Sequence, residues 1–218
     1  MTVVLHDYWR SSASYRVRIA LELKGIAHDR AAVDLVAGAQ RDPAHLARNP
    51  QGLVPVLEID GLRLTQSLAI IEYLDETRPG PPLLPADAAG RARVRALSQA
   101  IACEIHPLAN LRVLKRVEAL AGSEARAAWN RDTIAVGLEA VEALLAQGPA
   151  GRFCHGDQPG MADCTLIPQL YNATRWSVAF GHLPRITAVA ERCAGLPAFQ
   201  KAHPEHQPSP APALEAGG

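Results

Sequence analysis

The chain has 218 residues, of which 48% are hydrophobic and 20% are charged, and this composition is typical of a folded globular protein. Lys plus Arg equals Asp plus Glu at 22 each, so no overall field favours nucleic acid or an anionic membrane as a partner. The start, MTVVLHDYWR, has too short an apolar run for a signal peptide, and no later stretch reaches the roughly 18 uninterrupted apolar residues of a membrane span. We therefore expect a cytoplasmic protein with a small-molecule partner.

Strand and helix signals alternate in the first third of the chain. Residues 3–5 form a short apolar run typical of a buried strand, and Ser11, Ser12 and Ser14 are favoured residue types at a helix start. Gly25 is a stop signal for that helix, and the segment HDRAAVDL that follows predicts a second, weaker strand. The expected order is strand, helix, strand.

A β-hairpin is predicted next, in the segment VPVLEIDGLRLT. Apolar residues alternate on both sides of Asp60-Gly61, which is a preferred two-residue turn. The run LAIIEYLDE then places its apolar residues on one helical face, with Ser67 as the expected N-cap. The second part of this region is therefore strand, strand, helix.

The remainder of the chain is predicted to be helical. Residues 79–85, PGPPLLP, include four prolines and cannot continue a helix, so they indicate a linker after a first domain at residues 1–80. In residues 86–204 the apolar positions recur at spacings of three and four without strand alternation, which predicts an all-helical second domain. The Pro-, Ala- and Gly-rich residues 205–218 predict a disordered tail.

The four cysteines are scattered along the chain, at Cys103, Cys154, Cys164 and Cys193. They show neither Cys-x-x-Cys nor Cys/His ligand spacing, so the sequence predicts no metal site and no disulfide framework. We expect buried structural thiols, because free cysteine packs as a small hydrophobic residue.

The strongest binding signal is NPQGLVPVLEIDG followed by Gln66-Ser67. The Val54-Pro55 step suits a cis peptide bond, which only X-Pro bonds tolerate at low cost, and such a bend exposes the Val54 N–H and C=O to an extended peptide ligand. Ser67 at a helix N-terminus combines a hydroxyl, free N–H groups and the positive dipole end, which together suit a carboxylate. Taken singly, an ordinary turn and an ordinary cap are the commoner explanations.

Several motifs occur together in a familiar order. The arrangement WRSSASYRVRIALELKG, NPQGLVPVLEIDG, QSLAIIEYLDETRP, LLPAD, IHPLANLRVL, GDQPGMADC and a late Arg-Trp resembles the zeta-class glutathione transferases, the maleylacetoacetate and maleylpyruvate isomerases. The likeness runs from about residue 3 to about residue 200. It implies a thioredoxin-like α/β N-terminal domain, an all-α C-terminal domain, and a homodimer that uses reduced glutathione.

The resemblance assigns the glutathione sulfur to the serine turn. Ser11 matches the first serine of the family's Ser-Ser-Cys signature, which hydrogen-bonds the sulfur, and Ser12 follows it. Independently, a hydroxyl beside a helix N-terminus donates to a thiolate and lowers the thiol pKa. Ser12 and Ser14 share the turn, so the residues alone do not separate cap from activator. Ala13 stands where many members have cysteine, which removes one thiol but leaves serine-assisted activation possible.

The resemblance also implies ligands for the rest of glutathione. Val54 and Pro55 match the family's main-chain contact, and Gln66 and Ser67 match its γ-glutamyl contact. Gln40 precedes the Asn-Pro pair by nine residues, as the family's glycyl-end ligand does. A solvated glutamine is nearly as common at such a position.

Residues of the second domain and three arginines complete the implied site. His106, Asn110 and Arg112 match the family stretch that contacts the sulfur; on one continuous helix, residues 106 and 110 lie one turn apart and face the same way. Arg10, Arg112 and Arg175 align with family cations, which suit a diacid because guanidinium pairs bidentately with carboxylate. Helix caps and ordinary surface charges are the alternatives.

The implied activity is glutathione-dependent cis–trans isomerisation of a maleyl-type diketo diacid, maleylacetoacetate or maleylpyruvate, to the fumaryl isomer in aromatic amino-acid or aromatic-acid catabolism. Ser11 and Ser12 would keep the thiolate formed, and the three arginines would hold carboxylates and stabilise developing enolate charge. Glutathione transfer or dehalogenation of α-halo acids is the alternative enzyme activity. A non-catalytic glutathione-fold binding module is the alternative outside the enzymes.

The motif GDQPGMADC resembles the helix-starting capping box of transferases with this fold. Asp163 stands three residues after Gly160, which occupies the N-cap position in place of Ser or Thr. Glycine at an N-cap costs only about a few tenths of a kcal/mol, so we expect the helix to form. The motif then serves folding rather than catalysis.

Overall fold

The computed structural model describes residues 2–149 and 151–208, which form two compact units. The sheet unit contains the residues up to Gly80 together with those from Pro197 onward, and the helical unit contains Pro81–Leu196. The chain passes from the sheet unit to the helical unit between Gly80 and Pro81, inside the proline-rich linker, and returns to the sheet unit at Pro197. An α/β part and an all-α part are both present, so the predicted fold class is confirmed.

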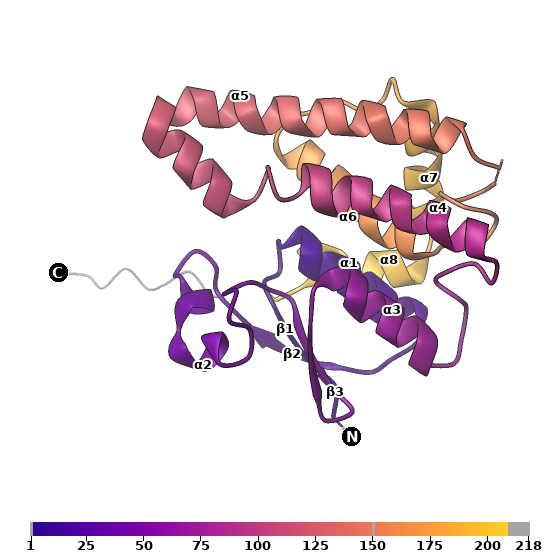
Figure 1. Cartoon of the computed structure of the whole chain (residues 1–218), viewed down its shortest axis with the longest axis horizontal. Helices are drawn as coiled ribbons and strands as arrows, with labels where there is room; N and C mark the ends of the chain where they lie inside the picture. The colour runs from indigo at the N-terminus through magenta and orange to yellow at the C-terminus, as the bar shows by residue number, and fades with distance from the viewer. Residues whose placement is uncertain (1, 150, 209–218) are drawn as a thin grey trace. The chain divides into compact units, whose positions relative to one another are not determined.

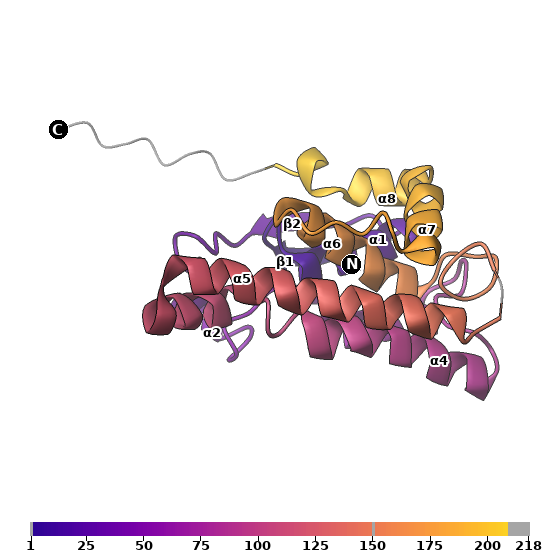
Figure 2. The ribbon, with the colours of Figure 1, turned by 90° about the horizontal axis from the view of Figure 1, so that it is seen from above.

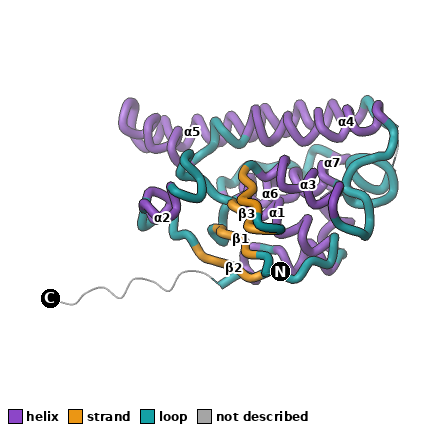
Figure 3. Tube along the Cα trace, turned by 60° about the horizontal axis from the view of Figure 1, so that its bottom comes forward, coloured by secondary structure: helices purple, strands orange, loops and turns teal. Residues whose placement is uncertain are grey.

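The sheet unit is built on a four-stranded mixed sheet, part of which is seen in the orange segments of Figure 3. Its strands are β1 (Val4–Asp7), β2 (Asp29–Ala32), β3 (Val56–Ile59) and β4 (Leu62–Thr65), in the order β2-β1-β3-β4. β1 pairs parallel to β2 and antiparallel to β3, and β3 pairs antiparallel to β4. The predicted succession of strands and helices along the chain and the predicted hairpin are therefore confirmed, and the sheet order is a finding of the structure.

Helices cover this sheet and complete the core of the unit. The two longest are α1 (Ser12–Leu23) and α3 (Ser67–Thr77), which lie side by side in Figure 1. Leu5 of β1, Leu57 of β3 and Ile71 of α3 are completely buried. The shorter elements are α2 (Pro43–Leu46), α8 (Pro197–Ala202) and 3₁₀ turns at Ala39–Arg41 and Pro204–His206.

Local sequence signals explain where these elements begin and end. The Ser11 hydroxyl caps α1 by accepting the Ser14 N–H at 3.2 Å. After α1 ends, Gly25 takes a positive φ of 64°, a conformation that glycine adopts without steric cost. In the hairpin turn Asp60 and Gly61 have φ values of 55° and 77°, as the two central residues of a type I′ turn require.

Residues 197–204 pack in a different unit from the one that the sequence predicts. The sequence groups residues 197–204 with the helical domain, whereas α8 packs on α1 in the sheet unit. The buried Arg18 of α1 explains this grouping, because its Nε donates to the Ala202 carbonyl at 3.0 Å and its Nη1 donates to Asp7 at 2.6 Å. Of the predicted tail, the first residues enter the last 3₁₀ turn, and residues 209–218 lie outside the described part of the chain.

The helical unit contains α4 (Ala88–Gln99), a π-helical turn (Ala100–Ile105), α5 (Leu111–Ala146), α6 (Met161–Arg175) and α7 (Pro184–Ala194). Figure 2 shows α5 as the long helix of this unit, and its path bends at Gly122, where φ is 87° and ψ is 173°. This backbone region is essentially restricted to glycine. Ile134, Leu138 and Leu166 belong to the buried core. Within residues 2–149 and 151–208, no helix is long and apolar enough to cross a membrane.

The cysteines follow the expectation of buried thiols with one exception. Cys154, Cys164 and Cys193 are buried, and burial raises the pKa of all three thiols above the usual range. Cys103 is exposed, so the expectation is wrong for this residue. It lies on the π-helical turn, which buries Ile101 and leaves Cys103 facing outward.

Candidate functional site

Three segments lie at the same end of strands β1, β3 and β4. They are the turn after β1, the residues before β3 and the start of α3. The register places His6 of β1 beside Val56, the first residue of β3, and places Val56 beside Thr65, the last residue of β4. Since strand pairing fixes these neighbours, it also brings together the segments that adjoin them. We name this region the candidate edge and define it as residues 9–12, 53–55 and 66–67.

Ser11 and Ser12 lie in the turn between β1 and α1. The Ser11 N–H donates to the Tyr8 carbonyl at 2.9 Å, and the Ser11 Oγ accepts the Ser14 N–H at 3.2 Å. A hydroxyl that accepts in this way still has its own proton to donate. Ser12 is the first residue of α1 and is only 8% exposed, so Ser11 is the more accessible of the two serines.

Arg10 precedes this turn and packs on aromatic rings. Its guanidinium lies 4.7 Å from the Trp9 ring centroid and 5.9 Å from that of Tyr8. Its Nη2 also donates to the Tyr8 hydroxyl at 3.2 Å. These cation–π and hydrogen-bond contacts hold a half-buried positive charge beside Ser11.

The main chain of Val54 is the second part of the candidate edge. The Val54–Pro55 peptide bond is cis, as the sequence predicts. Among the hydrogen bonds of residues 2–149 and 151–208, none involves the Val54 N–H or C=O. A main-chain N–H and C=O without partners among the described residues can pair with the extended backbone of a ligand.

Gln66 and Ser67 form the third part, with one correction to their expected roles. Gln66, at a positive φ of 67°, is the N-cap of α3, and its carbonyl accepts the Ile70 N–H at 3.0 Å. The prediction of Ser67 as N-cap is therefore wrong by one residue. Ser67 is the first helical residue, and its Oγ accepts a hydrogen bond from Nη1 of Arg16 at 3.2 Å. Its hydroxyl still lies at the positive end of the helix.

Arg16 is a candidate that the sequence reasoning misses. It lies on α1 and is 2% exposed, yet its guanidinium reaches Ser67 at the start of α3. A buried guanidinium and a helix N-terminus both attract an anion. The sequence feature that could have indicated Arg16 is an arginine within the mostly apolar helix SASYRVRIALEL. A charged side chain is almost never fully buried unless it is paired.

Gln40 lies in the 3₁₀ turn that precedes α2, close to the loop at Gly52. A side-chain carbon at Gly52 would lie 3.0 Å from the Gln40 carbonyl oxygen, and Gly52 has a positive φ of 61°. The turn that carries Gln40 therefore lies against the loop that leads to Val54.

His106 and Asn110 do not share a helix, so their predicted alignment on one helical face is wrong. His106 is the C-cap of the π-helical turn, and Asn110 is the N-cap of α5, where its Oδ1 accepts the Arg112 N–H at 3.0 Å. Pro107 lacks an N–H, and the asparagine side chain competes for main-chain donors, which together explain the break. Asn110 thus has the capping role that the sequence also allows.

Arg112 and Arg175 lie on separate helices of the helical unit. Arg112 is exposed near the start of α5. Arg175 is exposed at the end of α6, with its guanidinium 6.0 Å from the Tyr171 ring centroid. Both residues are positive charges on the surface of their unit.

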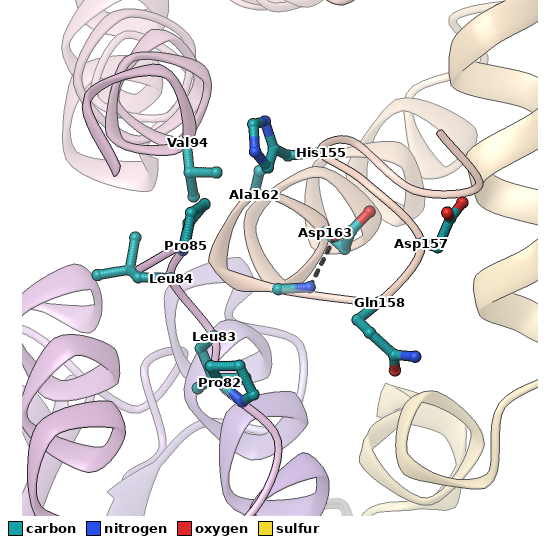
Figure 4. A pocket seen from close by; sticks show the side chains of 11 residues that line it. Pro82, Leu83, Leu84, Pro85, Val94, His155, Asp157, Gln158, Ala162 and Asp163 are labelled. Atoms are coloured by element: carbon teal, nitrogen blue, oxygen red, sulfur yellow. Dashed lines mark hydrogen bonds between the residues drawn. The ribbon is translucent and has the colours of Figure 1, made fainter. Parts of the chain in front are cut away.

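A cavity of about 180 Å³ lies within the helical unit, where the linker meets the start of α6 (Figure 4). Asp163 at its wall is 1% exposed and accepts the N–H groups of Gly160 at 2.8 Å and Cys154 at 2.9 Å. Burial raises the pKa of this carboxyl group. The predicted capping interaction is confirmed, and the carboxylate serves the main chain around it rather than a ligand.

Family models agree with this architecture. Residues 1–76 match the model described as glutathione S-transferase, N-terminal domain. Residues 115–204 match the model described as glutathione S-transferase, C-terminal domain. The two matches fall on the part of the chain that carries the sheet and on the part that is helical.

Known proteins match the chain over nearly its whole length. A maleylacetoacetate isomerase of Rhizobium meliloti is 60% identical over 204 residues, which cover 93% of this chain and 96% of the relative. The holo structure of a bacterial zeta-class maleylpyruvate isomerase is 45% identical with a TM-score of 0.91, covering 95% and 100% of the two chains. A maleylacetoacetate isomerase structure from Anaeromyxobacter dehalogenans, with glutathione bound in its active site, is 48% identical with a TM-score of 0.87, covering 95% and 97%. The chain belongs to the zeta class of glutathione transferases, the family of the maleylacetoacetate and maleylpyruvate isomerases.

Proposed function

We propose that this chain is a glutathione-dependent isomerase that converts maleylacetoacetate or maleylpyruvate into its fumaryl isomer. The observation that carries the proposal is the meeting of three features at the candidate edge. These are the Ser11 hydroxyl, the Val54 main chain and the Ser67 helix start beside Arg16. The named activities of the relatives support the same reaction.

The groups at the candidate edge fit glutathione, which is a peptide with charged ends. The Val54 N–H and C=O suit its peptide backbone, because they have no hydrogen-bond partner within the described residues. Ser67 with Gln66, next to the buried Arg16, suits the γ-glutamyl carboxylate. Gln40, close to Gly52, is placed in this proposal at the glycyl end.

Ser11 acts on the sulfur in this proposal, and Ser12 supports the same turn. When bound, glutathione supplies a thiol nucleophile that is regenerated in each turnover. The Ser11 Oγ already accepts the Ser14 N–H, so the hydroxyl proton is directed toward another acceptor. A donor beside a helix N-terminus stabilises negative sulfur and lowers the thiol pKa. The buried cysteines have raised pKa values and take no part.

Positive charges hold the diacid substrate in this proposal, and we assign this role to Arg10, Arg112 and Arg175. Arg10 is restrained by the rings of Trp9 and Tyr8, Arg112 lies near the start of α5, and Arg175 lies at the end of α6. Guanidinium groups bind carboxylates and stabilise the negative charge that develops on the substrate carbonyl oxygen.

His106 and Asn110 are proposed as further contacts to glutathione. Asn110 uses its Oδ1 for the cap of α5, which leaves its amide group as a donor.

We also propose a cytoplasmic homodimer, as the zeta-class relationship and the sequence suggest. Sedimentation of the purified chain tests the dimer.

An ultraviolet absorbance assay of the purified chain tests the proposed reaction. Maleylpyruvate and maleylacetoacetate are each mixed with the protein, with and without reduced glutathione. Isomerisation that requires glutathione supports the proposal, and the faster substrate identifies the preferred diacid. Absence of isomerisation, together with chloride release from a chloroacid, would instead support the dehalogenating transferase.

A further inference from the structure

The carbonyl oxygen of Leu53 accepts two side-chain hydrogen bonds. Nε2 of His45 lies 3.0 Å from it, and Nδ2 of Asn49 lies 2.9 Å from it. Both side chains belong to nearly buried residues, with exposures of 4% for His45 and 3% for Asn49. Because a carbonyl can only accept, the His45 ring must carry a proton on Nε2 in this contact.

This double contact also fixes the orientation of Val54. The Leu53 carbonyl and the Val54 N–H belong to one planar peptide unit and point in opposite directions. Two donors on the carbonyl therefore determine where the Val54 N–H points. A single donor would leave the peptide plane free to rock about that one bond.

The loop before Val54 is itself organised by Asn49. Its Oδ1 accepts the Gln51 N–H at 3.1 Å while its Nδ2 donates to Leu53, so one side chain spans the turn. The Gln51 side chain continues the connection, because its Oε1 accepts a hydrogen bond from Nε2 of Gln66 at 2.9 Å. The loop thus connects the segment of Val54 with that of Gln66 at the candidate edge.

We infer that His45 and Asn49 are positioning residues that orient the Val54 N–H toward the peptide backbone of glutathione. The inference rests on the proposed function, in which Val54 contacts glutathione. Neither side chain is placed against the ligand. Each acts through the Leu53–Val54 peptide unit.

Glutathione binding by variants of His45 tests the inference. His45→Phe keeps a ring of similar size but removes the donor, and we expect about fivefold weaker binding by calorimetry, within the roughly twofold to twelvefold range that one neutral hydrogen bond produces. His45→Gln carries an amide nitrogen at a similar distance from the main chain, and we expect affinity within about twofold of wild type. The KM for glutathione should rise in His45→Phe, while kcat at saturating glutathione stays unchanged.

His28→Phe is the matched control. Nδ1 of His28 also contacts a main-chain carbonyl, that of Ile26 at 3.1 Å. His28 precedes β2, whose first residue pairs with Val4, the first residue of β1. It therefore lies at the other end of the strands from the candidate edge. We expect its glutathione affinity to equal that of the wild type.

A second readout reports on the peptide unit directly. The amide NMR signal of ¹⁵N-labelled Val54 should shift on addition of glutathione in wild type and His45→Gln, with a smaller shift in His45→Phe. Wild-type affinity and an unchanged Val54 shift in His45→Phe would overturn this inference alone. A wild-type chain that does not bind glutathione would overturn the proposed function and this inference with it.

Discussion

Nη1 of Arg16 donates to Oγ of Ser67 across 3.2 Å, so a buried guanidinium of α1 meets the first residue of α3. We expect Ser67→Ala to weaken glutathione binding, because a hydrogen bond to a charged group contributes about 1.5–3 kcal/mol. This range corresponds to roughly 10- to 150-fold in dissociation constant, measured by calorimetry. Ser98→Ala removes a buried hydroxyl of the helical unit and should leave the affinity unchanged. Equal affinities for wild type and Ser67→Ala would contradict the assigned carboxylate site.

Ser11→Ala should lower kcat/KM at least tenfold, which is about 1.4 kcal/mol of barrier. The variant also loses the N-cap of α1 and should lose about 1 kcal/mol of stability. Titration of the ultraviolet thiolate absorbance of bound glutathione separates these effects, because only loss of the sulfur contact raises the thiol pKa.

The control for capping is Asp87→Ala, which removes the N-cap of α4 in the helical unit. It should lose similar stability and leave the thiol pKa unchanged. If Ser11→Ala also leaves the thiol pKa unchanged, Ser11 is a cap and not the residue that activates the sulfur.

Asp7 is completely buried and accepts hydrogen bonds from Arg18 and Arg30, each at 2.6 Å. We expect Asp7→Asn to lower the free energy of unfolding by about 3–5 kcal/mol, since the substitution leaves two guanidiniums without their carboxylate. Urea denaturation measures this loss. Asp60→Asn, which removes the exposed carboxylate partner of Arg78, should cost much less because solvent screens that pair. A larger loss for Asp60→Asn would contradict this ranking.

His203, directly after α8, packs edge-on against the Tyr15 ring with centroids 5.9 Å apart. Burial lowers the pKa of His203 below its usual 6.5; His206 and Arg18 act in the same direction, and Glu205 opposes them. Below pH 6.5 the unfolded chain therefore takes up the proton before the folded chain does. Neutral His203 therefore contributes to the free energy of unfolding. The contribution is fully present above pH 6.5 and is lost as the pH falls through the lower pKa of the folded state.

The thermal midpoint should accordingly decrease on acidification below pH 6.5. His203→Phe keeps an aromatic ring against Tyr15 but cannot bind a proton, so its midpoint should depend less on pH. Melting curves of both proteins over the same pH series measure the difference. Identical pH dependence in the two would show that His203 does not contribute.

Signals that act over a few residues predict turns and helix ends in both units. The Ser11 cap, the Gly25 stop, the Asp60-Gly61 turn and the Asp163 cap all follow from side chains that bond or shape their own main chain. Such interactions are determined within one short window of sequence. The sequence therefore predicts a helix start among Ser11, Ser12 and Ser14, and the structure identifies Ser11 as the cap.

Contacts between distant positions explain what the sequence does not predict. Arg16 and Ser67 are 51 positions apart, and no local pattern indicates that one meets the other. The packing of α8 on α1 depends in the same way on Arg18 and the carbonyl of Ala202. At Asn110 two local rules compete, helix continuation and side-chain capping, and capping prevails after a proline.

The thiol balance of the reaction tests the central claim most directly. Maleylpyruvate or maleylacetoacetate is converted by the enzyme with glutathione far below the substrate concentration, and free thiol is measured before and after. An isomerase that regenerates glutathione should convert all of the diacid to the fumaryl product with an unchanged amount of free thiol. Conversion that stops after one equivalent of glutathione, with loss of free thiol, would contradict the account and identify a conjugating transferase.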